Sequence, residues 1–291
     1  IGKTGIIGMP KLPIYSSLVM VDPTKTYKLE YSTVESYMID DINIIPNQRM
    51  VNGFEKESID EKDNNFYNSV KSYPIENVTM SEPLIMRDLV LINVSVTPFT
   101  YLPGSNQLEV ITSFDINLIE TDSRDDIRRR EMPKSKVFEN LYKNMIVNYD
   151  DDNNRNDNYQ DPTILYICSG SLEGNSTFQQ LVDWRKDRGY VVYTASLSET
   201  GSSASSIKNY IENAYDNFNP PPEYVALVGD VGGSYSIPTY YEDFGHDSYN
   251  NECEGDLPYS QLDGSDLFPE VIIGRMSLRS TSELSAVVAK I

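Results

Sequence analysis

The first 120 residues alternate between hydrophobic and polar positions over short runs. In the stretch 107–119, one face carries most of the apolar side chains, and Ile111 on the other face is an exception. The first face holds Leu108, Val110, Thr112, Phe114, Ile116 and Leu118. A period of two over this length predicts a half-buried antiparallel strand. Further β-branched or aromatic runs, bounded by Pro, Gly, Asn and Asp, lie at 18–21, 27–33, 37–45 and 88–96. Residues 1–120 are therefore predicted to form an all-β sandwich.

The stretch 121–162 has a different character and separates two domains. It contains a basic island in an otherwise acidic chain, made of Arg124, Arg128, Arg129, Arg130, Lys134 and Lys136. Val137, Leu141 and Met145 fall on one stripe of a short helix predicted over 136–147. Residues 150–158 contain no apolar side chain, so burial cannot offset the entropy lost in ordering them. They are predicted to be a linker.

Residues 163–291 show the pattern of an α/β domain. The run 163–168 is continuously apolar, as expected of a parallel strand that is buried on both faces. Phe178, Leu181 and Val182 follow at helical spacing, and Gly189 stands where a C-terminal cap glycine belongs. Further strands are predicted at 190–195, 224–228 and 271–273, with helices at 207–218 and 280–291. Strands that alternate with helices predict βαβ units and a mostly parallel sheet.

Composition and charge narrow the classes of partner. The 24 basic and 44 acidic residues give the 291-residue chain a formal charge of −20. This charge argues against nucleic acid and anionic membranes as partners, because both need a positive surface. No apolar run approaches the roughly 18 residues of a transmembrane segment. The 21 tyrosines suit a secreted β-rich protein, and a chain that begins at Ile1 is compatible with a leader already removed.

The two cysteines are too few for a disulfide framework. His246 and Cys253 invite a Cys–His pairing, because a base can activate a thiol. Both, however, lie in one loop between Pro238 and Pro269, and catalytic pairs are usually spatial rather than local. A fortuitous pair is therefore favoured. Cys168, inside an apolar strand, is predicted to be a core residue.

An acidic loop follows the predicted strand 224–228. Eight carboxylates lie in it: Glu242, Asp243, Asp247, Glu252, Glu254, Asp256, Asp263 and Asp266. This density of oxygen ligands suits Ca²⁺, although EF-hand spacing is absent and a solvated acidic loop stays an equal alternative. Asp230, at the end of the same strand, is interpreted as capping the backbone rather than as catalytic. Gly170 and Gly174 do not complete a nucleotide-binding pattern, so no organic cofactor is predicted.

Several motifs stand in a fixed order along the chain. In the second half they lie at 181–189, 224–230 with Ile237-Pro238, His246-Asp247, 259–264, 269–275 and 282–290, and in the first half at 8–13 and 87–103. Together they resemble the gingipain family of cysteine peptidases, which have a clostripain/caspase-like fold. The resemblance covers most of the chain. The pair His246-Asp247 replaces the Ser/Thr-Asp that is usual in the family.

The resemblance implies a β-sandwich pro-domain over 1–120, joined through a basic segment, short helix and acidic linker over 121–162. The stretch 163–291 would be the first, incomplete α/β subdomain of the catalytic domain. The family's catalytic His and Cys would then lie in a second subdomain beyond Ile291, so no catalytic residue is assigned to this chain.

The resemblance also bears on two candidate sites. It raises the expectation of structural calcium, with Asp247 and Asp263 as first choices, since they occupy the family's recurrent acidic positions. A processing or inhibitory segment is expected in the basic island, with a solvated loop as the alternative; its candidates are Arg128, Arg129 and Arg130.

The resulting hypothesis is a portion of a secreted gingipain-like cysteine endopeptidase precursor, found outside the cell or at its surface. Its substrates would be proteins or peptides, and its pro-domain would contact the catalytic domain of the same parent chain. A non-catalytic binding or surface module that keeps the scaffold is an alternative, as is a sortase-like member that processes secreted proteins. A His and a Cys after successive apolar strands beyond Ile291 would favour the enzyme over the binding module.

Overall fold

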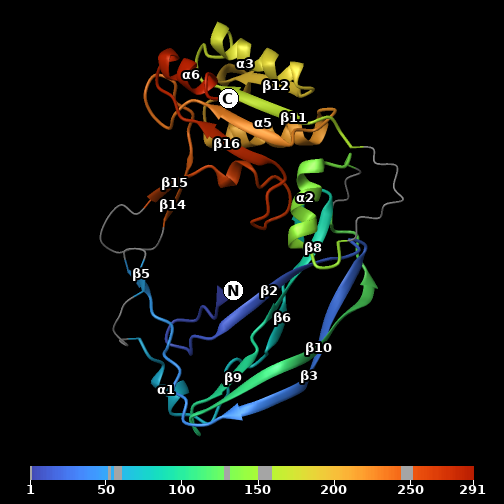
Figure 1. The fold of residues 1–291 in the computed structure, drawn as a ribbon, viewed down its shortest axis with the longest axis vertical. Helices are drawn as coiled ribbons and strands as arrows, with labels where there is room; N and C mark the ends of the chain where they lie inside the picture. The colour runs from blue at the N-terminus through green and yellow to red at the C-terminus, as the bar shows by residue number, and fades with distance from the viewer. Residues whose placement is uncertain (1, 52–53, 56–60, 128–131, 150–158, 244–251) are drawn as a thin grey trace. The chain divides into compact units, whose positions relative to one another are not determined.

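The computed structural model describes residues 2–51, 54–55, 61–127, 132–149, 159–243 and 252–291, which form two compact units (Figure 1). The first unit comprises Ile1–Leu84, Val90–Arg129 and Met145–Tyr149. The second comprises Ile85–Leu89, Arg130–Asn144 and Asp150–Ile291. Each unit is thus assembled from separate stretches of the chain. Within the described residues, no helix combines the length and the hydrophobicity needed to cross a bilayer.

The first unit is built on two antiparallel sheets. One has the strand order β1-β2-β8-β6, with β7 also paired to β8, and the other has the order β3-β10-β9. The strands of the first sheet are β1 (Gly2–Lys3), β2 (Pro13–Met20), β6 (Val78–Met80), β7 (Leu84–Met86) and β8 (Leu89–Val96), although the stretch Ile85–Leu89 groups with the second unit. Those of the second are β3 (Lys25–Ile39), β9 (Phe99–Leu102) and β10 (Gln107–Ser123). A hairpin of β4 (Met50–Val51) and β5 (Phe54–Glu55) and the short helix α1 (Asn64–Tyr67) are the remaining elements.

Apolar side chains of the two sheets meet in one cluster. Val78, Ile92 and Val94 of the first sheet are buried. They pack against partly buried side chains of the second sheet, among them Leu29 and Phe114. This packing of one sheet on the other confirms the predicted sandwich.

A bulge in β10 explains why Ile111 breaks the alternation of the sequence. Ile111 pairs with Ser36 of β3, but the next pair along β10 starts at Ser113, so Thr112 is the extra residue. Although Ile111 falls on the polar face of the predicted alternation, it is consequently buried, at 5% exposed.

The strand β3 corrects the prediction of two separate strands at 27–33 and 37–45. It runs on through Val34, Glu35 and Ser36 between them, because β10 offers an antiparallel partner from Lys25 to Ile39 that is interrupted only by bulges. Residues 40–45 lie outside the strand. Asp41 adopts a left-handed backbone with φ of 58°, which a strand cannot accommodate.

The second unit contains a parallel sheet with the strand order β12-β11-β13-β16 (Figure 1). Its strands are β11 (Thr163–Cys168), β12 (Val191–Ser196), β13 (Tyr224–Val228) and β16 (Ile272–Met276), with a separate hairpin of β14 (Tyr240–Asp243) and β15 (Glu252–Gly255). The helices are α2 (Lys136–Met145), α3 (Ser176–Asp187), α4 (Leu197–Thr200), α5 (Ala204–Asn217), α6 (Thr281–Val288) and the 3₁₀ helix η1 (Leu257–Tyr259). The predicted α/β domain with a parallel sheet is confirmed.

Helices cover both faces of this sheet. On one face, Phe178 of α3 and Leu284 of α6 pack against the strands in one buried cluster. On the other face, Ile207 and Ile211 of α5 belong to a second buried cluster. All six residues of β11 are buried between the two layers, as its continuous apolar run predicted.

Helix α3 ends at a glycine cap, as its sequence predicts, and begins at an asparagine cap. The Asn175 side chain accepts hydrogen bonds from N–H groups of the first turn, and Gly189 follows the helix with φ of 84°. On its surface, the Trp184 ring lies under two guanidinium groups, with Arg185 at 5.0 Å and Arg188 at 4.4 Å from the ring centre.

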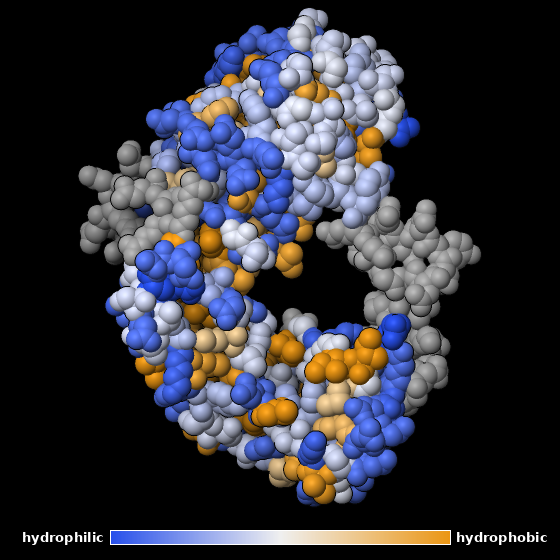
Figure 2. All heavy atoms as spheres, turned by 180° about the vertical axis from the view of Figure 1, so that it is seen from behind, coloured by the Kyte–Doolittle hydropathy of each residue, from blue (hydrophilic) through white to orange (hydrophobic). Residues whose placement is uncertain are grey.

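The surfaces of the two units differ in hydrophobicity. Figure 2 shows hydrophobic side chains interrupting the polar surface of the first unit. Twenty large hydrophobic side chains are exposed among the described residues, and sixteen of them belong to this unit. The most exposed are Val70 at 93% and Ile75 at 92%. The second unit buries its apolar side chains more completely.

Candidate functional site

The strand order of the parallel sheet reverses between β11 and β13, and open α/β sheets bind ligands at the carboxyl edge of such a point. Here the loops after the two strands contact each other. The Ser169 N–H donates to the Val228 carbonyl at 3.1 Å, and the Ser169 hydroxyl donates to the Ser236 carbonyl at 2.9 Å. A Cβ atom on Gly229 would lie 2.5 Å from the Tyr235 carbonyl oxygen, so the chain requires glycine there. Backbone of the loop after β13 therefore packs closely against this edge.

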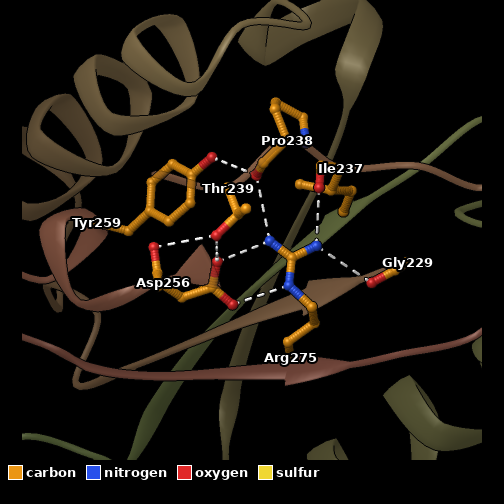
Figure 3. A network of polar contacts seen from close by, with 8 residues as sticks. Gly229, Ile237, Pro238, Thr239, Asp256, Tyr259 and Arg275 are labelled. Carbon is orange, nitrogen blue, oxygen red and sulfur yellow. Dashed lines mark hydrogen bonds and ion pairs between the residues drawn. The ribbon is translucent and has the colours of Figure 1, made fainter. Parts of the chain in front are cut away.

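Arg275 of β16 is the centre of a polar network at the same edge (Figure 3). Its Nε and Nη2 atoms donate to the two carboxylate oxygens of Asp256 at 2.8 and 2.7 Å. Its Nη atoms also donate to the carbonyl oxygens of Gly229, Ile237 and Pro238 at 3.3, 2.9 and 3.1 Å. The Arg275 side chain is 9% exposed, so these contacts compensate a cation that has lost most of its water.

Two hydroxyl groups complete the network. The Thr239 hydroxyl lies 2.9 Å from the Asp256 carboxylate and 3.0 Å from the Gly255 carbonyl oxygen. The Tyr259 hydroxyl donates to the Pro238 carbonyl at 2.6 Å (Figure 3). Burial raises the pKa of Tyr259 well above its usual range, so the hydroxyl stays a donor. The network joins the loop after β13 and the β14–β15 hairpin to β16, which is a structural role.

Asp230, at the end of β13, is also held by protein groups. It forms an ion pair with Arg279, whose side chain is 67% exposed. The hydrogen bond from Arg279, followed by that from the Val231 N–H, lowers the pKa of Asp230. The Asp230 backbone exchanges further hydrogen bonds with Tyr235 and Ile237. These contacts fit the capping interpretation, because an ionised carboxylate with fixed partners is a poor proton carrier.

The two cysteines occupy different elements. Cys168 is fully buried at the end of β11, where burial, together with the Glu173 charge, raises the pKa of its thiol well above the usual range. A buried, protonated thiol is a core residue, as predicted. Cys253 lies in β15 and pairs with Glu242. His246 lies outside the described residues, so the interpretation of His246 and Cys253 as a fortuitous pair stays a prediction.

Two carboxylates of the acidic loop, Asp263 and Asp266, accept hydrogen bonds from backbone N–H groups. Asp263 accepts the N–H of the next residue at 3.1 Å, and Asp266 accepts those of Ile85 and Phe268 at 2.7 and 2.8 Å. Among the residues that the structure describes, no three His, Cys, Asp or Glu side chains are grouped to hold a metal. Asp247 lies outside them. The described part of the loop thus does not supply a calcium ligand set, and the calcium site stays a prediction.

The basic island is described only in part. Arg124 forms an ion pair with Asp126 at 2.7 Å. The candidate processing or inhibitory residues Arg128, Arg129 and Arg130 lie outside the described residues, so that role also stays a prediction.

Glu270 is a buried carboxyl group that the sequence did not reveal. Its exposed fraction is zero, and one oxygen accepts the N–H groups of Leu262 and Asp263 at 2.6 and 3.2 Å. The other oxygen has no hydrogen-bond partner. Burial raises the pKa of Glu270 to about 7. A glutamate ahead of a strand is usually exposed, and no local pattern distinguishes this one.

Comparison with known proteins gives matches along nearly the whole chain. Residues 2–156 match the family model Propeptide_C25, and residues 157–291 match that of peptidase family C25; we call these the propeptide part and the peptidase part. Gingipain R1 of Porphyromonas gingivalis is 27% identical over 95% of this chain and 27% of its own length. Lys-gingipain of the same organism is 25% identical over 99% of this chain and 17% of its own length. The chain therefore spans less than a third of either relative.

Solved structures also match part of the chain, and one of them contains both a pro-domain and a mature domain. It is the complex of Porphyromonas gingivalis RgpB pro- and mature domains, which is 26% identical, covers 51% of this chain and 77% of its own, and has a TM-score of 0.43.

Proposed function

Because the chain belongs to peptidase family C25 and carries the propeptide of that family ahead of its peptidase part, we propose that it is a portion of a secreted gingipain-like cysteine endopeptidase precursor. The order of the two family matches carries the proposal, since a propeptide that precedes a peptidase is the arrangement of a zymogen. The parent protein hydrolyses peptide bonds of protein or peptide substrates outside the cell or at its surface.

The catalytic dyad of the parent lies downstream of Ile291. Two observations support this placement. Cys168, the cysteine whose side chain the structure describes, is buried and protonated, and the chain spans only 27% of Gingipain R1. In the parent, a downstream thiolate attacks the peptide carbonyl, a histidine transfers the proton, and backbone N–H groups stabilise the oxyanion. This chain contributes the parallel sheet, whose carboxyl edge Arg275 holds in place.

The propeptide part contacts the catalytic domain of its own chain and restrains it until the connection is cut. The basic residues Arg128, Arg129 and Arg130 are candidates for that processing or inhibitory segment.

We also propose that the acidic loop binds calcium through Asp247, with Asp263 as a second ligand. A rise in melting temperature on adding Ca²⁺, reversed by a chelator and lost in Asp247→Asn, tests this; no rise overturns it.

The assignment is tested in the full-length parent by replacing the cysteine that follows a buried strand downstream of Ile291 with alanine. We expect peptide hydrolysis to fall by a factor on the order of 10³ or more. Cys168→Ala is the matched control and should leave hydrolysis unchanged, because the thiol is buried. Hydrolysis that persists in the downstream variant contradicts the proposal. A wild-type parent without hydrolysis and without a His–Cys pair is instead a binding module.

A further inference from the structure

Arg87 is the largest of the fully buried side chains among the described residues, at 2% exposed. It belongs to the propeptide part and lies in the turn between β7 and β8. The stretch Ile85–Leu89 around it groups with the second unit, among residues of the peptidase part.

The Arg87 guanidinium is bound by three acceptors of the peptidase part. Nη1 donates to the carbonyl oxygens of Pro222 and Glu270 at 3.2 and 3.0 Å, and Nη2 donates to the Gln160 side-chain oxygen at 3.2 Å. Pro222 and Glu270 precede the adjacent parallel strands β13 and β16, so these carbonyls lie at the amino edge of the sheet. The Arg275 network lies at the opposite, carboxyl edge.

Aromatic rings enclose the same guanidinium. The ring of Phe138 in α2 lies 5.0 Å from it, and that of Tyr215 in α5 lies 5.5 Å from it. All three hydrogen-bond acceptors are neutral, so carbonyl dipoles and ring faces stabilise the buried charge. Loss of the guanidinium would leave the two carbonyl oxygens of the peptidase part without this donor.

The residues on either side of Arg87 are also held. The Tyr142 hydroxyl, on α2, lies 3.1 Å from the Met86 carbonyl and 2.7 Å from the Asp88 carboxylate, and Asp266 of the peptidase part accepts the Ile85 N–H at 2.7 Å. Arg87 itself has φ of 58°, a conformation that glycine adopts more easily. An arginine at such a position indicates that its side chain, not the turn, determines the residue type.

We propose that Arg87 anchors the propeptide part to the peptidase part at the amino edge of the sheet, and keeps the two parts associated when the predicted linker 150–158 between them is cut. The contact lies away from the carboxyl edge, where sheets of this type place their ligand-binding loops. It therefore retains the propeptide without occupying that edge. The inference goes beyond the proposed function and holds whether or not the parent is an active peptidase.

The test replaces residues 150–158 of this 291-residue chain with the recognition sequence of a site-specific protease. After cutting, wild-type fragments should co-elute on size exclusion, and their dissociation constant is measured with one fragment immobilised. We expect Arg87→Ala to raise this constant at least about tenfold, because three charge-assisted hydrogen bonds are lost. Arg49→Ala is the control, since Arg49 is 60% exposed and pairs with Glu61 within the propeptide part; it should bind as the wild type does. Equal binding of Arg87→Ala and wild type overturns the proposal.

Two further variants distinguish the effect of the Arg87 guanidinium from that of the turn conformation. Arg87→Gly relaxes the backbone but removes the guanidinium, so it should weaken association as much as Arg87→Ala; wild-type affinity in this variant would show that Arg87 only shapes the turn. Should Arg87→Ala fail to fold, Arg87→Lys decides, because it keeps the charge and loses the forked geometry. A several-fold weaker association in the lysine variant supports the anchor, and unchanged association overturns it.

Discussion

The two units differ in how deeply their strands are buried. All six residues of β11 in the second unit are buried, whereas eleven of the fifteen residues of β3 in the first unit are exposed and none is buried. A parallel strand needs cover on both faces, while an antiparallel ribbon tolerates water on one of them. We therefore expect stability in the second unit to depend on buried, fully bonded groups. In the first unit, stability should instead be distributed over many contacts between partly exposed side chains.

The largest expected effect comes from breaking the Arg275 network. Arg275→Gln should destabilise the second unit by about 3–5 kcal/mol, since it leaves Asp256 without its cation in a largely buried place. The matched change in the first unit is Arg49→Gln, where the pair with Glu61 has side chains that are 60% and 27% exposed. It should cost less than about 1 kcal/mol. Chemical denaturation, with hydrogen exchange resolved by peptide, measures both, and equal losses would contradict the comparison.

A core truncation should show the same contrast with a somewhat smaller effect. Ile167→Ala in β11 removes a side chain with no exposed surface and should cost about 3 kcal/mol. Ile119→Ala in β10 removes one that is 39% exposed and should cost about 1 kcal/mol or less. The two midpoints of urea unfolding give the difference. A larger loss for Ile119→Ala would mean that the first unit has a deeper core than the structure shows.

Glu270 makes the stability of the second unit depend on pH. Its folded pKa of about 7 lies above the ordinary value of 4.5, so the folded state holds the proton more tightly than the unfolded state does. The stabilisation is fully present below pH 4.5 and is lost as the pH rises to 7, by up to about 3 kcal/mol.

The variant Glu270→Gln should remove most of this dependence and gain stability relative to wild type at pH 8. Unfolding free energies at pH 5 and pH 8 are the measurement. Glu30→Gln in the first unit, where the side chain is 52% exposed, is the control and should keep the wild-type slope. An unchanged slope in Glu270→Gln would refute the assignment.

Helix caps should give the smallest effect, and the same one in both units. Asn175→Ala in the second unit and Asp63→Ala in the first each remove a side chain that accepts two first-turn N–H groups. Each should cost about 1 kcal/mol, because a cap is a local interaction that does not depend on core depth. Thermal unfolding of both variants tests this. A clearly larger loss of stability in one unit would mean that the two units differ in local structure rather than in burial.

The sequence predicted those features that depend on neighbouring residues. The run 163–168 and the glycine at 189 identified β11 and the end of α3, because burial on both faces and a left-handed cap each leave a local pattern. The prediction of two separate strands in place of β3 was wrong, because the continuity of this strand does not depend on neighbouring residues. Its continuity depends on pairing with β10, about 80 positions away, and polar residues in the middle of the strand conceal it.

The buried polar groups could not be predicted, because no local sequence pattern marks their partners. Arg87 meets its acceptors 73, 135 and 183 positions further along the chain. Glu270 accepts the N–H groups of Leu262 and Asp263, only eight and seven positions earlier, but no turn or helix motif in the sequence marks this contact. By sequence alone both side chains resemble solvated surface charges. Asp230 could be interpreted in advance, since a carboxylate directly after a buried strand is placed to cap its own turn.

The position of Trp184 makes the second unit separately visible to spectroscopy. It is the single tryptophan beside 21 tyrosines, and two guanidinium groups lie over its ring on α3. Excitation at the red edge of the absorption band selects the indole, so its emission reports the unfolding of that unit alone. When the unit unfolds, the two guanidinium groups leave the ring and the electric field at the indole changes. The wavelength of maximum emission then shifts. The chain thus contains its own fluorescent label, placed in one unit and absent from the other.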